Sequence, residues 1–441
     1  MSTPPHAQPV KPPFTIPTMA EIGAARGTAG LSVVSTFAGC GGSCLGFEMA
    51  GYRVLWANEF LPIARASYAA NHPDTILDGR DIRQVEAQQI LDAIGMQSGE
   101  LDVFNGSPPC QAFSSAGQGS KGWGKSRDYG NGVSQKNEDL FFDYIRLVRG
   151  LQPRVFVAEN VAGLTRGAAI GMFKIIMREL AGCGYAVRCK ILDAQWLGVP
   201  QSRSRAIFIG VRKDLGLEPE FPTPLPYRYT LREVLPGLRS VVHDTRTPSF
   251  SAGDVTDRPC PAITIGVNSL NSCHYKVIDR GCLEIDPATP NLPPSNLREW
   301  KRLRPGEQSG KFFSLIRASP DRPAPCITFG KGGTSASHCN EPRKFSIDEL
   351  RIICSFPQDF VLKGTYAEQW ARLGNAVPPL MMRAVAETLR DRIFSRIQRA
   401  KTAPARPPQP VLRVRAREAA PKSAMKARRK GPAVGHETES R

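Results

Sequence analysis

The chain has 441 residues, which is enough for two or three domains, and a net charge of +18 that favours nucleic acid or another anionic partner. It has no apolar run of 18 residues, which excludes a membrane-spanning helix, and the six prolines of Met1–Thr18 exclude a secretory signal. Eleven cysteines, an odd number, without such a signal indicate free thiols in a reducing cytosol.

The first elements predict a nucleotide-binding type of sheet. Residues 1–29 are rich in proline and are expected to be disordered. Residues 31–37 predict a buried strand, followed by a glycine-rich loop, a short helix to Met49 and a second strand over 52–57. Such a strand–loop–helix–strand unit usually begins a parallel, doubly wound sheet.

Alternation of strands and helices continues to about residue 215. Short apolar runs predict strands at 101–104, 155–158, 185–191 and 206–210. Helix-like stretches lie between them, at 140–148 and 172–180. We therefore expect an α/β domain over 30–215, with the doubly wound Rossmann-like architecture.

The remaining chain divides into three parts. Residues 216–362 are rich in proline, lack helical periodicity and predict a smaller, irregular domain. Residues 363–397 are helical, with Val385, Leu389, Ile393 and Ile397 on one apolar face. Residues 398–441 are expected to form a basic, disordered tail.

The first candidate site is the loop that contains Gly39, Gly41 and Gly42, where the backbone can approach a ligand closely. Glu59 ends the next strand, and a carboxylate there can accept hydrogen bonds from ribose hydroxyls. The third glycine of the dinucleotide fingerprint is replaced by Cys44. This pattern favours a nucleoside cofactor without a pyrophosphate, such as S-adenosylmethionine, over NAD; a purely structural turn is the alternative.

The second candidate site is Cys110, which follows two prolines just beyond a predicted strand. Because proline fixes its own backbone, the thiol has a stiff support at the sheet edge where ligands of such sheets bind. The usual alternative is an inert buried cysteine. The glycine-rich stretch that follows, 115–132, predicts a mobile lid.

Two further groups follow strands. Glu159 is a general-acid candidate, with a helix-capping or surface carboxylate as the alternative. Strand alternation would place Gln201, Arg203 and Arg205 on one face, where guanidiniums could hold a phosphate or a base oxygen; a salt-bridged strand edge is the alternative.

In this order the segments resemble the DNA cytosine-5 methyltransferase family, of the bacterial or phage restriction-modification type. The resemblance spans about residues 31–395. It is carried by Phe37-x-Gly39-x-Gly41-Gly42, Glu59, Asp81-Ile82, Pro109-Cys110-Gln111, Asn137–Phe141, Glu159-Asn160-Val161, Gln201-x-Arg203-x-Arg205, Arg343–Glu349 with Ser355-Phe-Pro357, and Arg372–Pro379. Pro108, Cys354 and Ser355 depart from the family's usual residues.

The resemblance implies transfer of a methyl group from S-adenosylmethionine to C5 of a flipped-out cytosine in a specific duplex DNA sequence, through a covalent adduct between cysteine and C6. The implied catalytic residues are Cys110, Glu159, Arg203 and Arg205. The implied cofactor contacts are Phe37, Gly39, Cys40, Gly41, Gly42, Glu59, Phe60, Asp81, Ile82, Leu140 and Asn375. The implied substrate contacts are Gln111, Ser114, Asn160 and Gln201.

The resemblance also implies interaction partners, an oligomeric state and a cellular location. Double-stranded DNA is the expected partner, read by residues 216–362, with a cognate restriction endonuclease acting separately; the chain is expected to be a monomer, in the cytoplasm and associated with the nucleoid. No metal and no membrane are expected. Lys311, Arg317, Lys331 and Arg343 are candidate phosphate or base contacts, and a solvated surface position is the favoured alternative for each of them.

Three other functions stay open at this point. One is an RNA cytosine methyltransferase with the same catalytic core, although the Cys-Phe-Thr element of that branch is not found. The second is a DNA-binding regulator with an inactive core, which the presence of Cys110, Glu159 and Arg205 argues against. The third is an NAD-type oxidoreductase, which Cys44 and the Pro-Pro-Cys segment disfavour.

Overall fold

The computed structural model describes most of the chain between residues 10 and 402. The described residues are 10–109, 127–128, 134–135, 140–235, 288–312, 315–328 and 336–402. Residues Met1–Gln398 form one compact unit and Arg399–Arg441 a second.

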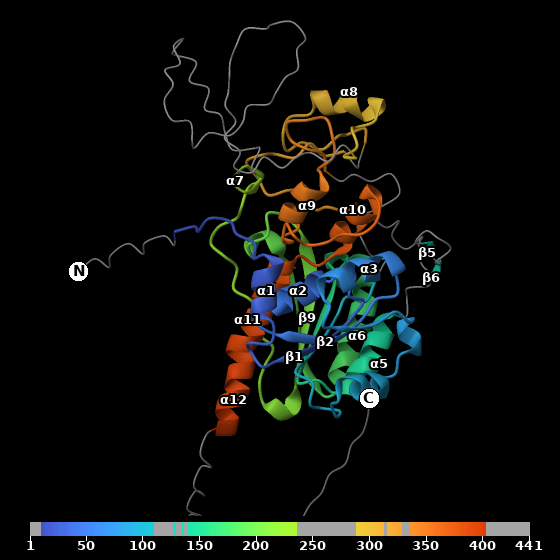
Figure 1. Ribbon diagram of the computed structural model, residues 1–441, viewed down its shortest axis with the longest axis vertical. Helices are drawn as coiled ribbons and strands as arrows, with labels where there is room; N and C mark the ends of the chain where they lie inside the picture. Colours follow the sequence, from blue (N-terminus) through green and yellow to red (C-terminus); the bar gives the residue numbers. More distant parts are fainter. Residues whose placement is uncertain are drawn as a thin grey trace, which may run out of the picture. The chain divides into compact units, whose positions relative to one another are not determined.

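A seven-stranded sheet with the order β3-β2-β1-β4-β7-β9-β8 organises the first unit (Figure 1). Its strands are β1 (Ser32–Thr36), β2 (Arg53–Asn58), β3 (Ile76–Asp78), β4 (Val103–Gly106), β7 (Val155–Val161), β8 (Tyr185–Asp193) and β9 (Ser204–Arg212). A separate pair, β5 (Arg127–Asp128) and β6 (Ser134–Gln135), is antiparallel. The α/β prediction is therefore confirmed.

The sheet is parallel from β3 to β7, whereas β9 runs antiparallel to both β7 and β8. From β1 the chain builds outward through β2 to β3, and it then returns to place β4 on the other side of β1. The gap between β1 and β4 is a topological switch point, where ligands of such sheets bind beyond the carboxyl ends of the strands.

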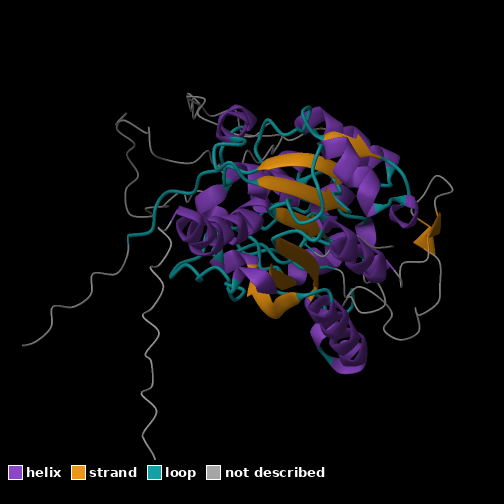
Figure 2. Cartoon of the chain, turned by 90° about the horizontal axis from the view of Figure 1, so that it is seen from below, coloured by secondary structure: helices purple, strands orange, loops and turns teal. Residues whose placement is uncertain are grey.

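Apolar side chains alternate between the two faces of the sheet. Val33 and Val157 belong to one buried cluster, and their neighbours Val34 and Phe156 belong to another. Because both faces are buried there, consecutive apolar residues occur in the central strand β7, as in residues 155–158. Figure 2 shows the strands between layers of helices.

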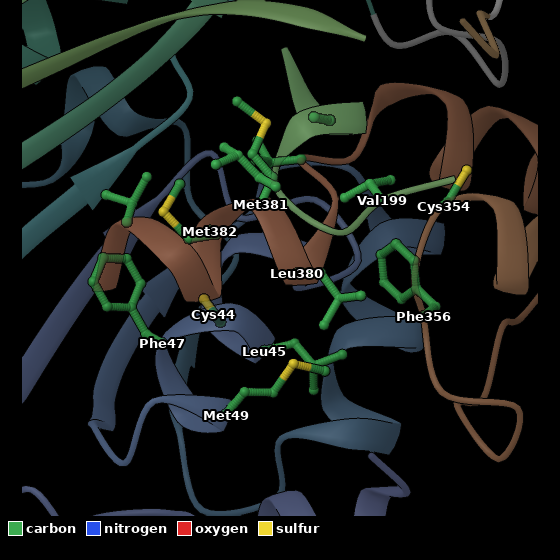
Figure 3. Packing of buried hydrophobic residues seen from close by; sticks show 14 of the residues in the cluster. Cys44, Leu45, Phe47, Met49, Val199, Cys354, Phe356, Leu380, Met381 and Met382 are labelled. Atoms are coloured by element: carbon green, nitrogen blue, oxygen red, sulfur yellow. The ribbon is translucent and has the colours of Figure 1, made fainter. Parts of the chain in front are cut away.

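One face is covered by α2 and α11, and the other by α4, α5 and α6. Figure 3 shows Phe47 of α2 near Met382 of α11, and Leu45 of α2 near Leu380 of α11. At Gly46 a Cβ would lie 2.6 Å from the carbonyl oxygen of Pro379, so only glycine allows this approach. The helices of the two faces are α2 (Gly42–Met49), α3 (Pro62–Asn71), α4 (Ala87–Ile94), α5 (Leu140–Leu151), α6 (Ile170–Gly182), α10 (Tyr366–Asn375) and α11 (Pro379–Leu389).

The C-terminal helical prediction is confirmed. A π-helical turn, Arg390–Phe394, joins α11 to α12 (Ser395–Thr402), and Val385, Leu389, Ile393 and Ile397 are all buried. The expected start of the tail at residue 398 lies inside α12. Residues 403–441 lie outside the described part of the chain.

The N-terminal segment is ordered over its described residues, so the expectation of disorder is wrong for residues 10–29. α1 (Met19–Ala25) begins with a capping box in which Thr18 and Glu21 exchange hydrogen bonds. Before the helix, Lys11 forms an ion pair with Glu233, and the hydroxyl of Tyr229 donates to the Pro12 carbonyl at 2.9 Å. These contacts tie the segment to residues that lie 217 or more positions later.

The described parts of 216–362 contain α7 (Leu231–Val234), α8 (Pro294–Arg302) and α9 (Ile347–Ile353). α9 begins with a capping box in which Ser346 and Glu349 exchange hydrogen bonds. Residues 318–362 continue the core on the face covered by α2, while Leu292, Trp300, Leu303 and Leu315 form a small separate cluster.

Candidate active site

The glycine-rich loop begins where β1 ends, at the switch point. Phe37 has a φ of +53°, which is rare for a large side chain, and Gly39 and Gly41 have φ values of +59° and +102°. Such backbone strain often accompanies functional sites. Gly41 is the N-cap of α2, so the first amides of that helix lie next to the loop.

Glu59 holds this loop from the end of β2. Its Oε2 accepts from the Gly39 amide at 2.8 Å, and its Oε1 accepts from the Leu61 amide at 2.8 Å. The side chain is buried, and burial raises the pKa of the carboxyl group although both hydrogen bonds oppose this shift. A carboxylate oxygen can accept more than one hydrogen bond, so Glu59 keeps capacity for ribose hydroxyls.

The C-terminal motif closes the same loop. A Cβ at Gly42 would lie 2.3 Å from the carbonyl oxygen of Val377, so the two segments touch through their backbones. Asn375, at the end of α10, is exposed and available to a ligand. Cys40 is 1% exposed and burial raises the pKa of its thiol to about 12, so a contact to a ligand must come from its backbone.

The remaining predicted cofactor contacts lie beyond β3 and at the start of α5. Asp81 caps the 3₁₀ turn Ile82–Gln84 and pairs with Arg83. Ile82 and Leu140 belong to the same buried cluster, and Arg146 of α5 donates to the Ile82 carbonyl at 2.9 Å. The half-buried ring of Phe60 follows Glu59 directly. The chain thus gathers an acid at the end of β2 and another after β3.

The geometry of this region suits a nucleoside ligand, which the glycine loop, Glu59 and Asn375 could hold. The loop is a cradle with close backbone approach, its glycines exclude side chains at Gly41 and Gly42, and a buried carboxylate stands beside it. Ligand amides and hydroxyls need such oriented acceptors and donors.

Glu159 and Arg205 form an ion pair between β7, the strand next to β4, and β9. In the antiparallel register of β7 and β9, Arg205 lies opposite Val161, two residues from Glu159. Nε of Arg205 is 2.8 Å from Oε1 of Glu159, and both side chains are mostly buried. Burial and the neighbouring Arg203 lower the pKa of Arg205. Glu159 and Asn160 lie inside β7, whereas the sequence predicted that they follow the strand.

Asn160 connects this pair to the predicted cysteine loop. Its amide nitrogen donates to the Pro108 carbonyl at 3.0 Å, and its amide oxygen accepts from Val161. Both ends of the buried amide are therefore engaged within the protein. Asn160 holds the chain two residues before Cys110, in addition to any contact that it makes with substrate.

Gln201 and Arg203 lie just before β9, and Arg203 is a charged neighbour of Arg205. The strand begins only at Ser204, and both earlier side chains are buried. Arg203 donates to the Ile327 carbonyl at 3.1 Å, and the amide nitrogen of Gln201 donates to the sulfur of Cys354 at 3.3 Å. They join the start of β9 to the chain beyond residue 320.

Other predicted residues fall outside the described part of the chain. Cys110, Gln111, Ser114 and Lys331 are among them, as is the predicted lid over 115–132 except for Arg127–Asp128 of β5. Within the described residues, no group of three or more His, Cys, Asp or Glu side chains could hold a metal.

Two of the candidate DNA contacts are structural instead. Arg343 is buried and its guanidinium donates to both oxygens of Glu349. Arg317 donates to the Leu303 carbonyl at 2.8 Å and stacks 4.1 Å from the centre of the Trp300 ring. Lys311 is exposed and lies over the ring of Phe312. Basic character alone did not distinguish interior from surface positions.

Comparisons with known proteins agree with this geometry. The family model described as C-5 cytosine-specific DNA methylase matches residues 31–391. The type II methyltransferase M1.HphI of Haemophilus parahaemolyticus is 31% identical over 365 residues, covering 81% of this chain and 86% of that protein. M.NgoFVII of Neisseria gonorrhoeae is 31% identical over 349 residues, covering 79% and 83%.

Solved structures share the fold. A prophage-encoded protein of E. coli superposes with a TM-score of 0.59 at 23% identity, covering 81% of this chain and 98% of that one. A DNMT2 mutant from Spodoptera frugiperda gives a TM-score of 0.54 at 17% identity, covering 81% and 98%. Among the described residues, no helix has the length and apolar character needed to cross a membrane.

Proposed function

Since the chain belongs to the C-5 cytosine-specific DNA methylase family and resembles type II restriction-modification methyltransferases, we propose that it transfers a methyl group from S-adenosylmethionine to C5 of a flipped-out cytosine in one short duplex sequence. The observation that supports this most directly is the Glu159–Arg205 pair beside the chain that leads to Cys110. The glycine loop with Glu59 supports the choice of methyl donor.

S-adenosylmethionine supplies an activated methyl group for transfer to carbon. The residues proposed to hold it are Phe37, Gly39, Cys40, Gly41, Gly42, Glu59, Phe60, Asp81, Ile82, Leu140 and Asn375. Glu59 would accept from the ribose hydroxyls, and the backbone of the loop would lie against the amino-acid portion.

Cys110 is the proposed nucleophile. Cytosine C5 is a weak nucleophile within the aromatic ring, so the ring must first be activated. Addition of the Cys110 thiolate to C6 opens the C5–C6 double bond and gives C5 enamine-like reactivity. C5 then takes the methyl group and releases S-adenosylhomocysteine. A base such as water or hydroxide accepts the C5 proton, and the electrons of that C–H bond re-form the C5–C6 double bond as the sulfur–C6 bond breaks and releases the thiolate.

Glu159 and Arg205 would stabilise the charge that thiolate addition places on the ring. A protonated Glu159 can donate to N3, and the Arg205 guanidinium can donate to O2. An ion pair requires an ionised Glu159, whereas donation to N3 requires its proton. Glu159 must therefore gain a proton when the base enters, while its other oxygen can still accept from Arg205. Neither contact is accessible within stacked DNA, so the cytosine must leave the helix.

The domain assignment belongs to this proposal. Residues 30–215 with 363–397 would form the catalytic part, 216–362 the part that reads bases, and 398–441 a basic tail. Arg203 and Gln201 would act from the interior, by fixing β9 against residues near Ile327 and Cys354. The enzyme would act as a monomer in the cytoplasm on nucleoid DNA, with any cognate nuclease acting separately.

Bisulfite sequencing of DNA from cells that express the protein tests the proposal. We expect 5-methylcytosine in one fixed short context, and its loss in the Cys110→Ala variant, which should still bind S-adenosylhomocysteine. Methylation that persists in Cys110→Ala would refute the covalent step. Absence of 5-methylcytosine from DNA, with methylated RNA in its place, would favour the RNA-directed alternative.

A further inference from the structure

A fully buried histidine lies directly beneath the glycine loop. His72 caps the C-terminus of α3, and its side chain has no exposed surface. A Cβ at Gly41 would lie 2.3 Å from Nε2 of His72 and 2.9 Å from its Cδ2. The edge of the imidazole therefore packs directly against the backbone of Gly41. Gly41 has the largest positive φ of the loop.

The imidazole is held in this orientation on two sides. Its Nδ1 lies 3.1 Å from Oε2 of Glu48, a residue of α2 that is also fully buried. Its ring stacks on Tyr68, with 4.4 Å between ring centres. With Nδ1 turned toward Glu48, the opposite edge of the ring faces Gly41. Among the described residues, Nε2 has no hydrogen-bond partner, so its place is set by packing.

Arg26 fixes the far side of Glu48. Nε of Arg26 is 3.0 Å from Oε1 of Glu48, and the same guanidinium reaches Asp74 at 2.9 Å. The side chain of Asp74 is 63% exposed, whereas that of Glu48 is fully buried. Of the two ion pairs of Arg26, the one with Glu48 is therefore the one shielded from water. A carboxylate buried without such partners would be strongly unfavourable.

Arg26 follows α1 and precedes residue 31, where the family match begins. A chain of contacts thus runs from outside the matched region through Glu48 and His72 to Gly41. None of these three supporting side chains belongs to the predicted site. These contacts all lead to Gly41, which is the N-cap of α2. The Gly41 amide donates a hydrogen bond to the Ala38 carbonyl at 2.9 Å.

We propose that His72 is a positioning residue that holds Gly41 in the conformation needed to bind the methyl donor, and that Glu48 and Arg26 fix its imidazole. The inference rests on the proposed function, because it takes S-adenosylmethionine as the ligand of the loop. Without the imidazole the turn at Gly41 loses its support and the amides at the start of α2 lose their fixed direction. The catalytic pair, Glu159 and Arg205, lies on β7 and β9 and is not part of this chain of contacts.

Calorimetric titration of the full-length protein with S-adenosylhomocysteine tests the proposal. We expect His72→Ala to weaken binding by about tenfold or more, and His72→Asn to recover part of the loss because its amide can still face Glu48. The matched control is His338→Ala, which removes an equally buried histidine beside Glu349, away from the loop. Its affinity for S-adenosylhomocysteine should stay within about twofold of wild type.

Kinetics separate positioning from general destabilisation. With duplex DNA in excess, His72→Ala should raise KM for the methyl donor and leave kcat within about threefold, because the catalytic groups are unchanged. If His72→Ala does not fold, Arg26→Gln replaces it, with Asp74→Asn as its control. Arg26→Gln should weaken S-adenosylhomocysteine binding by about threefold or more, and Asp74→Asn should not change it.

The outcomes are distinct. Unchanged affinity in folded His72→Ala, or equal affinities in Arg26→Gln and Asp74→Asn, would overturn the positioning role and leave the proposed function intact. Loss of affinity in His338→Ala equal to that in His72→Ala would also overturn it, because the effect would then reflect stability. Failure of the wild type to bind S-adenosylhomocysteine would instead refute the proposed function.

Discussion

Nε of Arg205 lies 2.8 Å from Oε1 of Glu159, across the antiparallel pair of β9 and β7. The strand that runs against the rest of the sheet is what brings the two residues together. A parallel β9 would carry Arg205 to the opposite edge, because this residue lies at the start of its strand. The reversal of β9 is therefore what pairs Arg205 with Glu159.

Glu159→Gln should lower methyl transfer by about 100-fold or more, since an amide cannot give up a proton to N3. It also leaves the Arg205 guanidinium without its carboxylate partner, which should lower the free energy of unfolding. Transfer of labelled methyl groups to DNA measures the first effect and urea denaturation the second. Glu179→Gln, at a more exposed ion pair on α6, is the control. Unimpaired transfer in Glu159→Gln would contradict the assigned role.

Glu59→Gln should separate stability from ligand binding. The substitution removes a carboxylate whose pKa is raised by burial, but it also weakens acceptance from the amides of Gly39 and Leu61. These effects oppose each other, so Tm should change by only a few degrees. Binding of S-adenosylhomocysteine should weaken by about tenfold, because acceptors for ribose hydroxyls are lost. Glu218→Gln, at an exposed ion pair with Arg188, should change neither quantity. Tight binding by Glu59→Gln would remove this residue from the site.

His338 should make the protein less stable in mild acid. Burial lowers the pKa of its imidazole to about 4, with Arg343 acting in the same direction and Glu349 and Glu341 opposing it. The folded state therefore prefers neutral His338, and this contribution is complete above pH 6.5 and is lost as the pH falls toward 4. The expected loss is about 2 kcal/mol at pH 5.

Urea denaturation of wild type and His338→Gln at pH 7 and pH 5 measures this contribution. The neutral glutamine cannot titrate, so wild type should lose more free energy of unfolding than the variant over this range. Equal losses in the two proteins would show that His338 is not the group responsible.

Truncation after Thr402 should weaken DNA binding mainly at low salt. The removed residues, 403–441, carry ten Lys or Arg and three Glu. Basic residues that contact phosphates release counterions, so their contribution falls as salt rises. At about 50 mM salt the truncated protein should bind DNA more weakly than the full-length protein, and at about 300 mM salt the two affinities should be similar. The methylated sequence should stay the same, and a changed context would show that the tail takes part in base reading.

The sequence was most informative where local pattern determines structure. The apolar run before Phe37, the glycines after it and the apolar strand before Glu159 each specify an element without reference to distant residues. Parallel strands then place the ends of β1 and β4 beside each other. The predicted helix face through Val385 and Ile397 was correct for the same reason.

Distant contacts were not predictable in this way. Alternation from Gln201 to Arg205 assumed a strand that in fact begins at Ser204, and the partners of Arg203 lie more than 120 residues away. The helix at Met19 was missed because nearby prolines suggested disorder, although Thr18 and Glu21 have the spacing of a capping box. No local pattern marks His72, because its neighbours Glu48 and Gly41 come from other elements.

The close approach of α11 to Gly46 has a consequence for biosynthesis. A ribosome makes the strand–loop–helix unit early, but the backbone that covers α2 is translated more than 330 residues later. At roughly 5–20 residues per second, the apolar side chains Leu45 and Phe47 would wait tens of seconds for Leu380 and Met382. The nascent chain must therefore shield this surface in another way, and chaperone capture is expected to concentrate on it.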